Sequence, residues 1–345
     1  MTSAPGESRV PPRRAGRVAG AMLVLVALVL LAAGARMLVG WSAWGWPQGE
    51  LAGLVIRSRG FLVAIAAVVG AALALSGVSL QALLRNSLAE PYILGLSTGA
   101  AVGLMAQALA QRYWHVSLGA GHVGAAAGAA ASMLVVFSAS RRHGVLDPLG
   151  LLLTGVVLSS INGAMILLLN YIVGPGGIRD NLAQWMMGYL NEGVRTSTLI
   201  VVAVVTVAGL AGLLAAVPAI DIATLSETEA RSLGIHLPRL RVLLFLTASL
   251  LTAGAVLLAG PIAFVGLIGP HIARLLVGPS HLLLLPAAAL AGAAVVLTAD
   301  LISATLASLW PGMGVLPVGI FTALVGGPAF LWLLHPHLGR GHTDW

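Results

Sequence analysis

Long apolar segments separated by short polar ones dominate the chain. A helix needs roughly 20 apolar residues to cross the hydrocarbon core of a bilayer, and about ten segments approach or reach this length. They cover residues 17–39, 61–84, 92–111, 117–138, 149–173, 194–217, 241–259, 263–277, 282–308 and 315–334. The pattern predicts an all-α polytopic membrane protein with about ten transmembrane helices. The eighth segment is the shortest, and a half-buried helix is the alternative to a full span there.

The two ends of the chain are more polar than the spans. Residues 1–16 are rich in Pro, Arg, Ser and Gly, which predicts a disordered basic tail, and residues 337–345 form a polar stub. Residues 17–336 are therefore interpreted as one transmembrane domain. The first apolar run is too long for the core of a cleaved signal peptide, so we interpret it as an uncleaved helix.

The most informative polar segment is the loop at residues 220–240, between two spans. Here Leu225, Glu229 and Leu233 recur every four residues, and Gly234 follows as a helix stop. The segment is too polar to cross a bilayer, so the spacing predicts a short amphipathic helix at the membrane surface. Such a helix is suited to docking another protein, which indicates that the chain is one subunit of a larger assembly.

Composition narrows the possible functions. A chain that is 59% hydrophobic and 8% charged is not an ordinary soluble domain. All 18 cations are arginine, so a GxxxxGK[ST] phosphate-binding loop is impossible, and any ATP hydrolysis that drives transport would belong to another polypeptide. Because cysteine is absent, disulfides and thiolate metal sites are excluded.

The arginines also predict the orientation of the chain. With the N-terminus inside, about twelve arginines fall on the cytoplasmic side and about six on the other, as the positive-inside rule requires. This places both termini and the 220–240 loop in the cytoplasm. The net charge of +7 then reflects membrane topology, and it does not call for a nucleic acid partner.

Asp300 is the acidic residue that lies within one of the predicted spans, 282–308. A carboxylate inside the membrane is costly and is a functional candidate by default. We favour a structural role, because a proton relay would need further titratable groups and the histidines mostly fall at the ends of spans. No clustered reactive set supports an enzyme, and neither a cofactor nor a metal site is expected.

Glycine and proline mark close packing and broken spans. The pairs Gly99/Gly103 and Gly124/Gly128 predict tight packing of helices within the chain, with a dimer seam as the alternative. Gly–Pro steps crowd the last quarter of the sequence. Irregular backbone at membrane depth is tolerated only where it is buried in protein or lines a wet cavity. These breaks indicate a transport pathway, and kinks for packing alone are the alternative.

Four stretches together resemble the FecCD-type permease family, the membrane subunits of ABC importers for iron–siderophores, haem and cobalamin. The first runs over residues 70–100 and contains Arg85-Asn86-Ser87-Leu88-Ala89-Glu90-Pro91; the second is Trp185-Met186-Met187-Gly188. The third and fourth cover residues 260–274 and 316–328. They occur in the family's order and at its spacing.

The resemblance implies a type II ABC importer permease fold in the bacterial cytoplasmic (inner) membrane. It implies four kinds of partner: a second copy of the chain in a homodimer, two ATP-binding cassette subunits on the cytoplasmic side, an extracytoplasmic substrate-binding protein, and membrane lipid. Coupling to the ATPase is expected at Leu225, Glu229, Ala230, Leu233 and Gly234.

Extracytoplasmic arginines at loop edges are the candidate docking points for acidic residues of the binding protein, with anchoring at lipid headgroups as the alternative. These are Arg57, Arg59, Arg179 and Arg195. The sequence departs from the family here, because Arg59-Gly60-Phe61-Leu62 lacks the second arginine of Arg-x-Pro-Arg. We expect Arg57 to substitute for it.

Two further departures lie later in the chain. The resemblance implies that the first of them, like the arginine missing from Arg-x-Pro-Arg, is a lost extracytoplasmic docking point for the binding protein. Ala304 stands where the family has an arginine four residues after Asp300, and Val315 stands where it has a glutamate. Losing both charges is easier to understand than losing one, because a lone buried charge is costly. Without that arginine, we expect Asp300 to accept hydrogen bonds from neutral donors or to be protonated.

The sequence therefore predicts a permease that passes a metal chelate, an iron–siderophore or haem, into the cytoplasm. A cobalamin permease of the same family is the alternative. An ion-coupled secondary transporter has less support, because it would need ionisable groups deep in several spans.

Overall fold

The computed structural model describes residues 12–40, 44–115, 122–142, 145–172, 185–224, 227–310, 312 and 314–338. Its long helices are α1 (Pro12–Leu38), α2 (Ala52–Leu84), α3 (Leu96–Trp114), α4 (His122–Ala139), α5 (Pro148–Ile172), α7 (Thr196–Ala223), α9 (Leu237–Ala259), α10 (Val265–Val277), α11 (His281–Leu309) and α12 (Val318–Leu338). Two short helices, η1 (Pro91–Leu94) and α8 (Glu227–Ser232), join them. The strands β1 (Arg141–Arg142) and β2 (Val145–Leu146) form a small antiparallel hairpin.

The all-α prediction is confirmed, and each predicted span corresponds to one long helix, except that the segment 92–111 is divided between η1 and α3. In the described part of the chain, six helices are long and apolar enough to cross a membrane, and shorter apolar helices accompany them. Helices suit this setting because they satisfy every backbone polar group internally, which lipid cannot do.

Several predicted boundaries are wrong. α1 begins at Pro12, inside the expected tail, and α2 begins at Ala52, well before the predicted start at residue 61. Charged residues in the first turns of α2 hid its start from the hydropathy pattern. The polar loop is shorter than 220–240, because α7 ends at Ala223 and α9 begins at Leu237. Most of the predicted tail and stub lies outside the described residues, so their disorder stays a prediction.

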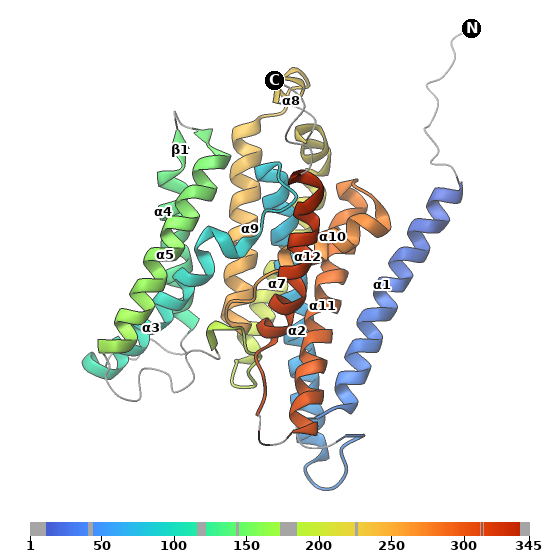
Figure 1. The fold of residues 1–345 in the computed structure, drawn as a ribbon, viewed down its shortest axis with the longest axis vertical. Coiled ribbons are helices and arrows are strands. Elements are labelled where there is room, and N and C mark those ends of the chain that lie inside the picture. Colours follow the sequence, from blue (N-terminus) through green and yellow to red (C-terminus); the bar gives the residue numbers. More distant parts are fainter. Residues whose placement is uncertain are drawn as a thin grey trace.

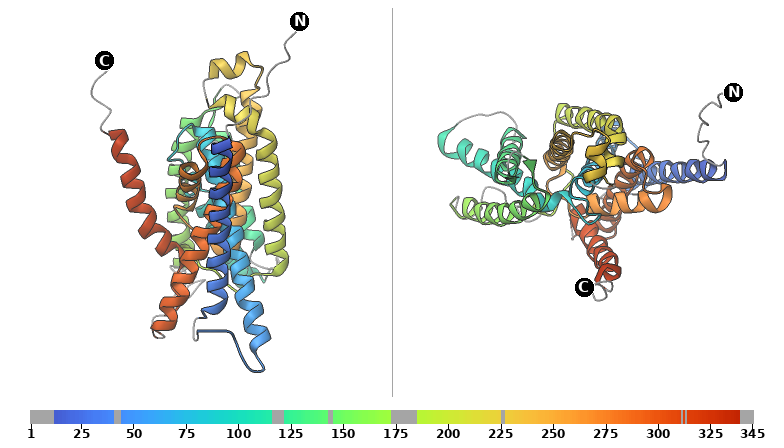
Figure 2. Two further views of the ribbon diagram at one scale, coloured as in Figure 1. Left: turned by 90° about the vertical axis from the view of Figure 1, so that its right-hand side faces the viewer. Right: turned by 90° about the horizontal axis from the view of Figure 1, so that it is seen from above.

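The long helices run roughly side by side (Figure 1). α2 lies centrally, α3, α4 and α5 form a group on one side, α1 flanks the other side, and α12 diverges from the bundle toward its C-terminal end (Figure 2). We call one end of the bundle the α8 end; it also holds the start of α1 and the end of α12. The opposite end, with the last turn of α1 and the start of α2, is the Arg36 end.

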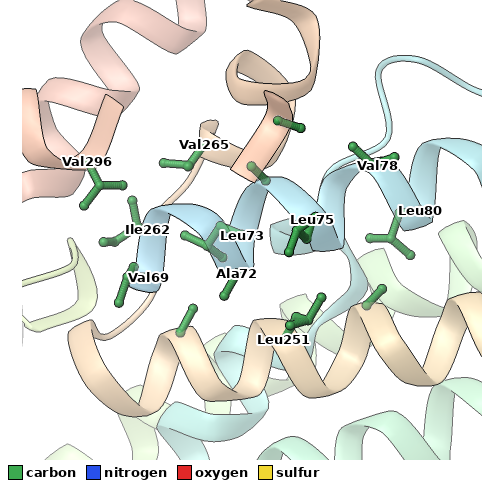
Figure 3. Packing of buried hydrophobic residues seen from close by; sticks show 14 of the residues in the cluster. Val69, Ala72, Leu73, Leu75, Val78, Leu80, Leu251, Ile262, Val265 and Val296 are labelled. Atoms are coloured by element: carbon green, nitrogen blue, oxygen red, sulfur yellow. The ribbon is translucent and has the colours of Figure 1, made fainter. Parts of the chain in front are cut away.

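The core of the bundle forms around α2. Its apolar side chains pack against α9 and the segment that leads into α10 (Figure 3). A side chain at Gly70 would overlap the backbone of Gly292 in α11, and one at Gly77 would overlap the backbone of Gly266 in α10. The absence of side chains therefore brings α2, α10 and α11 into backbone contact.

The small-residue pairs in α3 and α4 serve the same purpose. A Cβ at Gly103 would overlap the Gly124 carbonyl oxygen, and one at Gly128 would overlap that of Gly99. α3 and α4 thus pack against each other through these faces, and the prediction of packing within the chain is confirmed.

Candidate functional site

The four stretches that carry the family resemblance meet around residues 260–266. The second stretch touches the third, where a Cβ at Gly188 would overlap the side chain of Ile262. It also touches the fourth, where a Cβ at Gly319 would overlap the Met187 carbonyl oxygen. The first stretch reaches the same place through Gly77, so segments far apart in sequence form one junction.

Residues 260–264 link α9 to α10 inside this junction. Gly260, Pro261 and Ile262 are buried among protein atoms, as irregular backbone at membrane depth must be. Within one chain, this break serves packing. The alternative interpretation, a transport pathway, would require a surface that a second copy of the chain completes.

Polar side chains connect the first and third stretches. The Gln81 side-chain amide donates to the Gly266 carbonyl at 3.2 Å, and Arg274 Nη2 donates to Gln81 Oε1 at 2.5 Å. The backbone N–H of Phe264 donates to Glu90 Oε1. Glu90 lies in the loop between α2 and η1, outside the spans, and burial raises the pKa of its carboxyl group to about 7. The start of α10 is therefore fixed to the end of α2.

Asp300 has a cationic partner. Arg36 Nε donates to Asp300 Oδ2 at 2.6 Å, and the two side chains are 1% and 4% exposed. Arg36 Nη1 also donates to the Val39 carbonyl at 2.7 Å. The expectation of neutral donors or a protonated carboxyl is wrong, because the cation comes from α1 and not from α11. The paired geometry supports the structural role, since an intramembrane charge is tolerated when it is paired.

The four candidate docking arginines fall in different environments. Arg57, on α2, and Arg195, which precedes α7, are exposed at the Arg36 end. Arg59 is only 7% exposed and donates to the carbonyls of Met37 and Gly45 at 2.7 and 3.0 Å. This position does not fit a surface docking point, because Arg59 holds α2 to the last turn of α1 and to the segment after it. Arg179 lies outside the described residues.

The candidate coupling element is α8 and the turn that follows it. Ala230 is buried against the bundle, Glu229 is exposed, and Leu233 is 63% exposed. Gly234 has φ +78°, and the N–H groups of Gly234 and Ile235 donate to the carbonyls of Arg231 and Ala230. This is a Schellman end, for which glycine is the favoured residue. The predicted helix and its stop are present, while Leu225 lies outside the described residues.

The end of α7, just before α8, is held by two contacts that the sequence did not reveal. Arg85 Nη2, at the end of α2, donates to the Ala223 carbonyl at 2.7 Å. The ring of His281, the first residue of α11, contacts the carboxylate of Asp221 through Nδ1. Neither contact has a sequence signal, because the partners are far apart along the chain.

Comparisons with known proteins agree with this assembly of motifs. The sequence profile of the FecCD transport family matches residues 20–336. The hemin transport system permease protein HmuU of Yersinia pestis is 37% identical over 281 residues, which cover 79% of this chain and 80% of the relative. The vitamin B12 import system permease protein BtuC of Shigella sonnei is 37% identical over 317 residues, covering 91% and 92%.

A solved structure supports the fold. It is an inward-facing conformation of a transporter assigned to the metal-chelate ABC type, with a TM-score of 0.78 and 29% sequence identity. The match covers 92% of this chain and 99% of that chain. Both the sequence and the arrangement of helices therefore match over nearly the whole length.

Proposed function

The chain belongs to the FecCD transport family and is a permease of an ABC transporter, and we propose that it imports a metal chelate, an iron–siderophore or haem. It would act as a homodimer in the bacterial inner membrane, with both termini in the cytoplasm and the substrate passing between the two copies. The chain itself would carry out no covalent chemistry.

The observation that carries this proposal is α8, a polar helix exposed between two apolar spans. The chain contains no lysine and hence no phosphate-binding loop of the GxxxxGK[ST] type, so it depends on a separate ATPase subunit for ATP-driven transport. α8 lies at the end that the arginine distribution places in the cytoplasm. An exposed Leu233 beside the glycine turn that ends α8 offers that ATPase an apolar contact.

The identity of the transported chelate is the more specific part of the proposal. Among the relatives, one is named for hemin and others for vitamin B12. A cobalamin permease is therefore the second candidate. All three cargoes are bulky, and they suit a pathway that would form between two copies instead of within one tightly packed bundle.

Reconstitution with the co-purified ATPase and binding protein tests the proposal. Vesicles would be supplied with haem, a ferric siderophore or cobalamin, and uptake would be measured with and without ATP. We expect ATP-dependent uptake of haem or the siderophore. Uptake of cobalamin alone would establish the second candidate. Uptake that needs a proton gradient and no ATP would contradict an ABC importer.

A further inference from the structure

α11 connects the two ends of the bundle. It has 29 residues, so it is about 43 Å long at 1.5 Å per residue. Near its middle, Gly292 lies in backbone contact with Gly70 of α2. No side chain lies between the two backbones here, so nothing between α2 and α11 can absorb a small displacement of either helix.

At the Arg36 end, α11 holds three neighbouring segments. Asp300 pairs with Arg36 of α1 at 2.6 Å. Ser303 Oγ donates to the Leu316 carbonyl, just before α12, at 2.6 Å. Trp44 Nε1, after α1, donates to Ser308 Oγ at 2.7 Å. A displacement of α11 would therefore move α1, the segment after it and the start of α12.

At the α8 end, α11 begins on the carboxylate of Asp221. The His281 ring donates from Nδ1 to Asp221 Oδ1, since a carboxylate accepts. The His281 backbone N–H donates to the same oxygen at 3.3 Å. Asp221 belongs to the last turn of α7, directly before the chain turns toward α8. A negative charge is favourable at the N-terminus of a helix, which stabilises this arrangement.

We propose that the Asp221–His281 contact is the positioning link through which movement of α8 reaches α11, and through α11 the Arg36 end of the molecule. The proposal rests on the proposed function, because it assumes that a partner ATPase moves α8. Arg85 supports the same link from α2 by holding the Ala223 carbonyl. The end of α7 is thus joined to both members of the α2–α11 pair.

Removing the link should separate ATP hydrolysis from transport. The variants are Asp221→Ala and His281→Leu, studied in vesicles with the partner ATPase and binding protein. His281→Asn is the rescue variant, because the asparagine amide places an N–H donor near the position of Nδ1. Asp147→Ala is the matched control: Asp147 accepts from the Gly150 N–H at the start of α5 at 2.9 Å, and it has no contact with α7 or α11 among the described interactions.

Haem, a ferric siderophore and cobalamin serve as probes, and the one that the wild type takes up with ATP is then used throughout. We expect Asp221→Ala and His281→Leu to keep ATP hydrolysis within about twofold of the wild type while uptake per ATP falls at least about fivefold. His281→Asn should recover most of the loss, and Asp147→Ala should behave as the wild type. A purely structural role would instead lower hydrolysis and uptake together, which would overturn the proposal.

A distance measurement gives a readout that does not depend on cargo. The chain contains no cysteine, so spin labels can be attached at Leu309→Cys on α11 and Tyr171→Cys at the end of α5, both of which are exposed. We expect a non-hydrolysed ATP analogue to shift the distance between the labels in the wild type and in Asp147→Ala. The shift should disappear in Asp221→Ala.

An unchanged shift in Asp221→Ala, or no shift in the wild type, would overturn the link. Failure of the proposed function is distinguishable, because the wild type would then show no ATP-dependent uptake of any of the three probes.

Discussion

The two ends of the bundle are held in different ways. At the Arg36 end the central contact is an ion pair between side chains that are 1% and 4% exposed. At the α8 end the corresponding contact joins His281, 9% exposed, to Asp221, 40% exposed, and α8 itself presents Leu233 to the surroundings. Breaking a buried pair leaves an uncompensated charge, whereas a partly exposed pair can exchange its partner for water. The Arg36 end is thus fixed, and the α8 end can be adjusted by a partner.

The largest effect should come from the fixed end. Arg36→Leu leaves the Asp300 carboxylate buried without its cation, which typically costs about 3–5 kcal/mol. We expect a correspondingly lower thermal stability in detergent. The double variant Arg36→Leu/Asp300→Leu removes both charges and should recover most of the loss. Arg57→Leu, at the same end but exposed, is the control and should change stability by less than about 0.5 kcal/mol.

A double variant as unstable as Arg36→Leu would show that the pair contributes through shape or further contacts. Asp300→Asn separates a structural role of Asp300 from a role in ion coupling. Since it keeps an acceptor for Arg36, it should lower stability but retain measurable transport. A stable Asp300→Asn protein without transport would instead revive ion coupling.

A second prediction concerns the buried carboxyl group of Glu90, between α2 and η1. The folded protein binds a proton there more tightly than the unfolded chain does, because burial raises the pKa from 4.5 to about 7. The contribution of Glu90 to stability is then fully present below pH 4.5 and is lost as the pH rises through 7, by about 3 kcal/mol in all. Glu90→Gln should remove most of this slope in melting experiments between pH 5 and 8.

The exposed Glu192→Gln is the control for this experiment, and it should keep the wild-type slope. A Glu90→Gln slope equal to that of the wild type would contradict the raised pKa of Glu90.

How well the sequence predicts these contacts depends on how far apart the two partners lie along the chain. The presence and order of the long helices and the stop at Gly234 follow from apolar runs and local turn chemistry, and those predictions are confirmed. The partner of Asp300 was missed, because Arg36 is 264 residues away and no spacing rule relates the two. The available signal is that Arg36 lies in the last turn of an apolar helix, where a charged side chain needs a partner. The start of α2 was placed too late, because hydropathy treats Arg59 as exposed although it is buried.

A third prediction addresses the adjustable end. Gly234→Arg places a long side chain on the exposed turn after α8, where there is open space but the backbone is left-handed. The folded permease should tolerate this, with a strain of about 1–2 kcal/mol. We expect uptake per ATP to fall about tenfold, equivalent to about 1.4 kcal/mol, because the contact with the ATPase is disturbed. Leu233→Asp should act similarly without backbone strain.

Gly314→Arg, in the link between α11 and α12, is the matched control for Gly234→Arg, because Gly314 also has a positive φ and open space around it. It should share the strain and keep the coupling. Full uptake by both the Gly234 and Leu233 variants would rule out α8 as the coupling element.

The smallest effect is expected at the exposed rim of the fixed end. Arg57 and Arg195 are the exposed residues among the candidate docking arginines. Ser58 Oγ donates to Glu192 at 2.6 Å, and this hydrogen bond holds the loop before Arg195 against α2. Surface charges mainly change the rate of association and its salt dependence. Reversing both to glutamate should slow binding-protein association several-fold at low salt, with a smaller effect near 0.5 M, where screening shortens the reach of each charge. Arg17→Glu, at the α8 end, should leave the rate unchanged. Equal rates for the wild type and the double variant at every salt concentration would place docking elsewhere and leave headgroup anchoring as the role of these arginines.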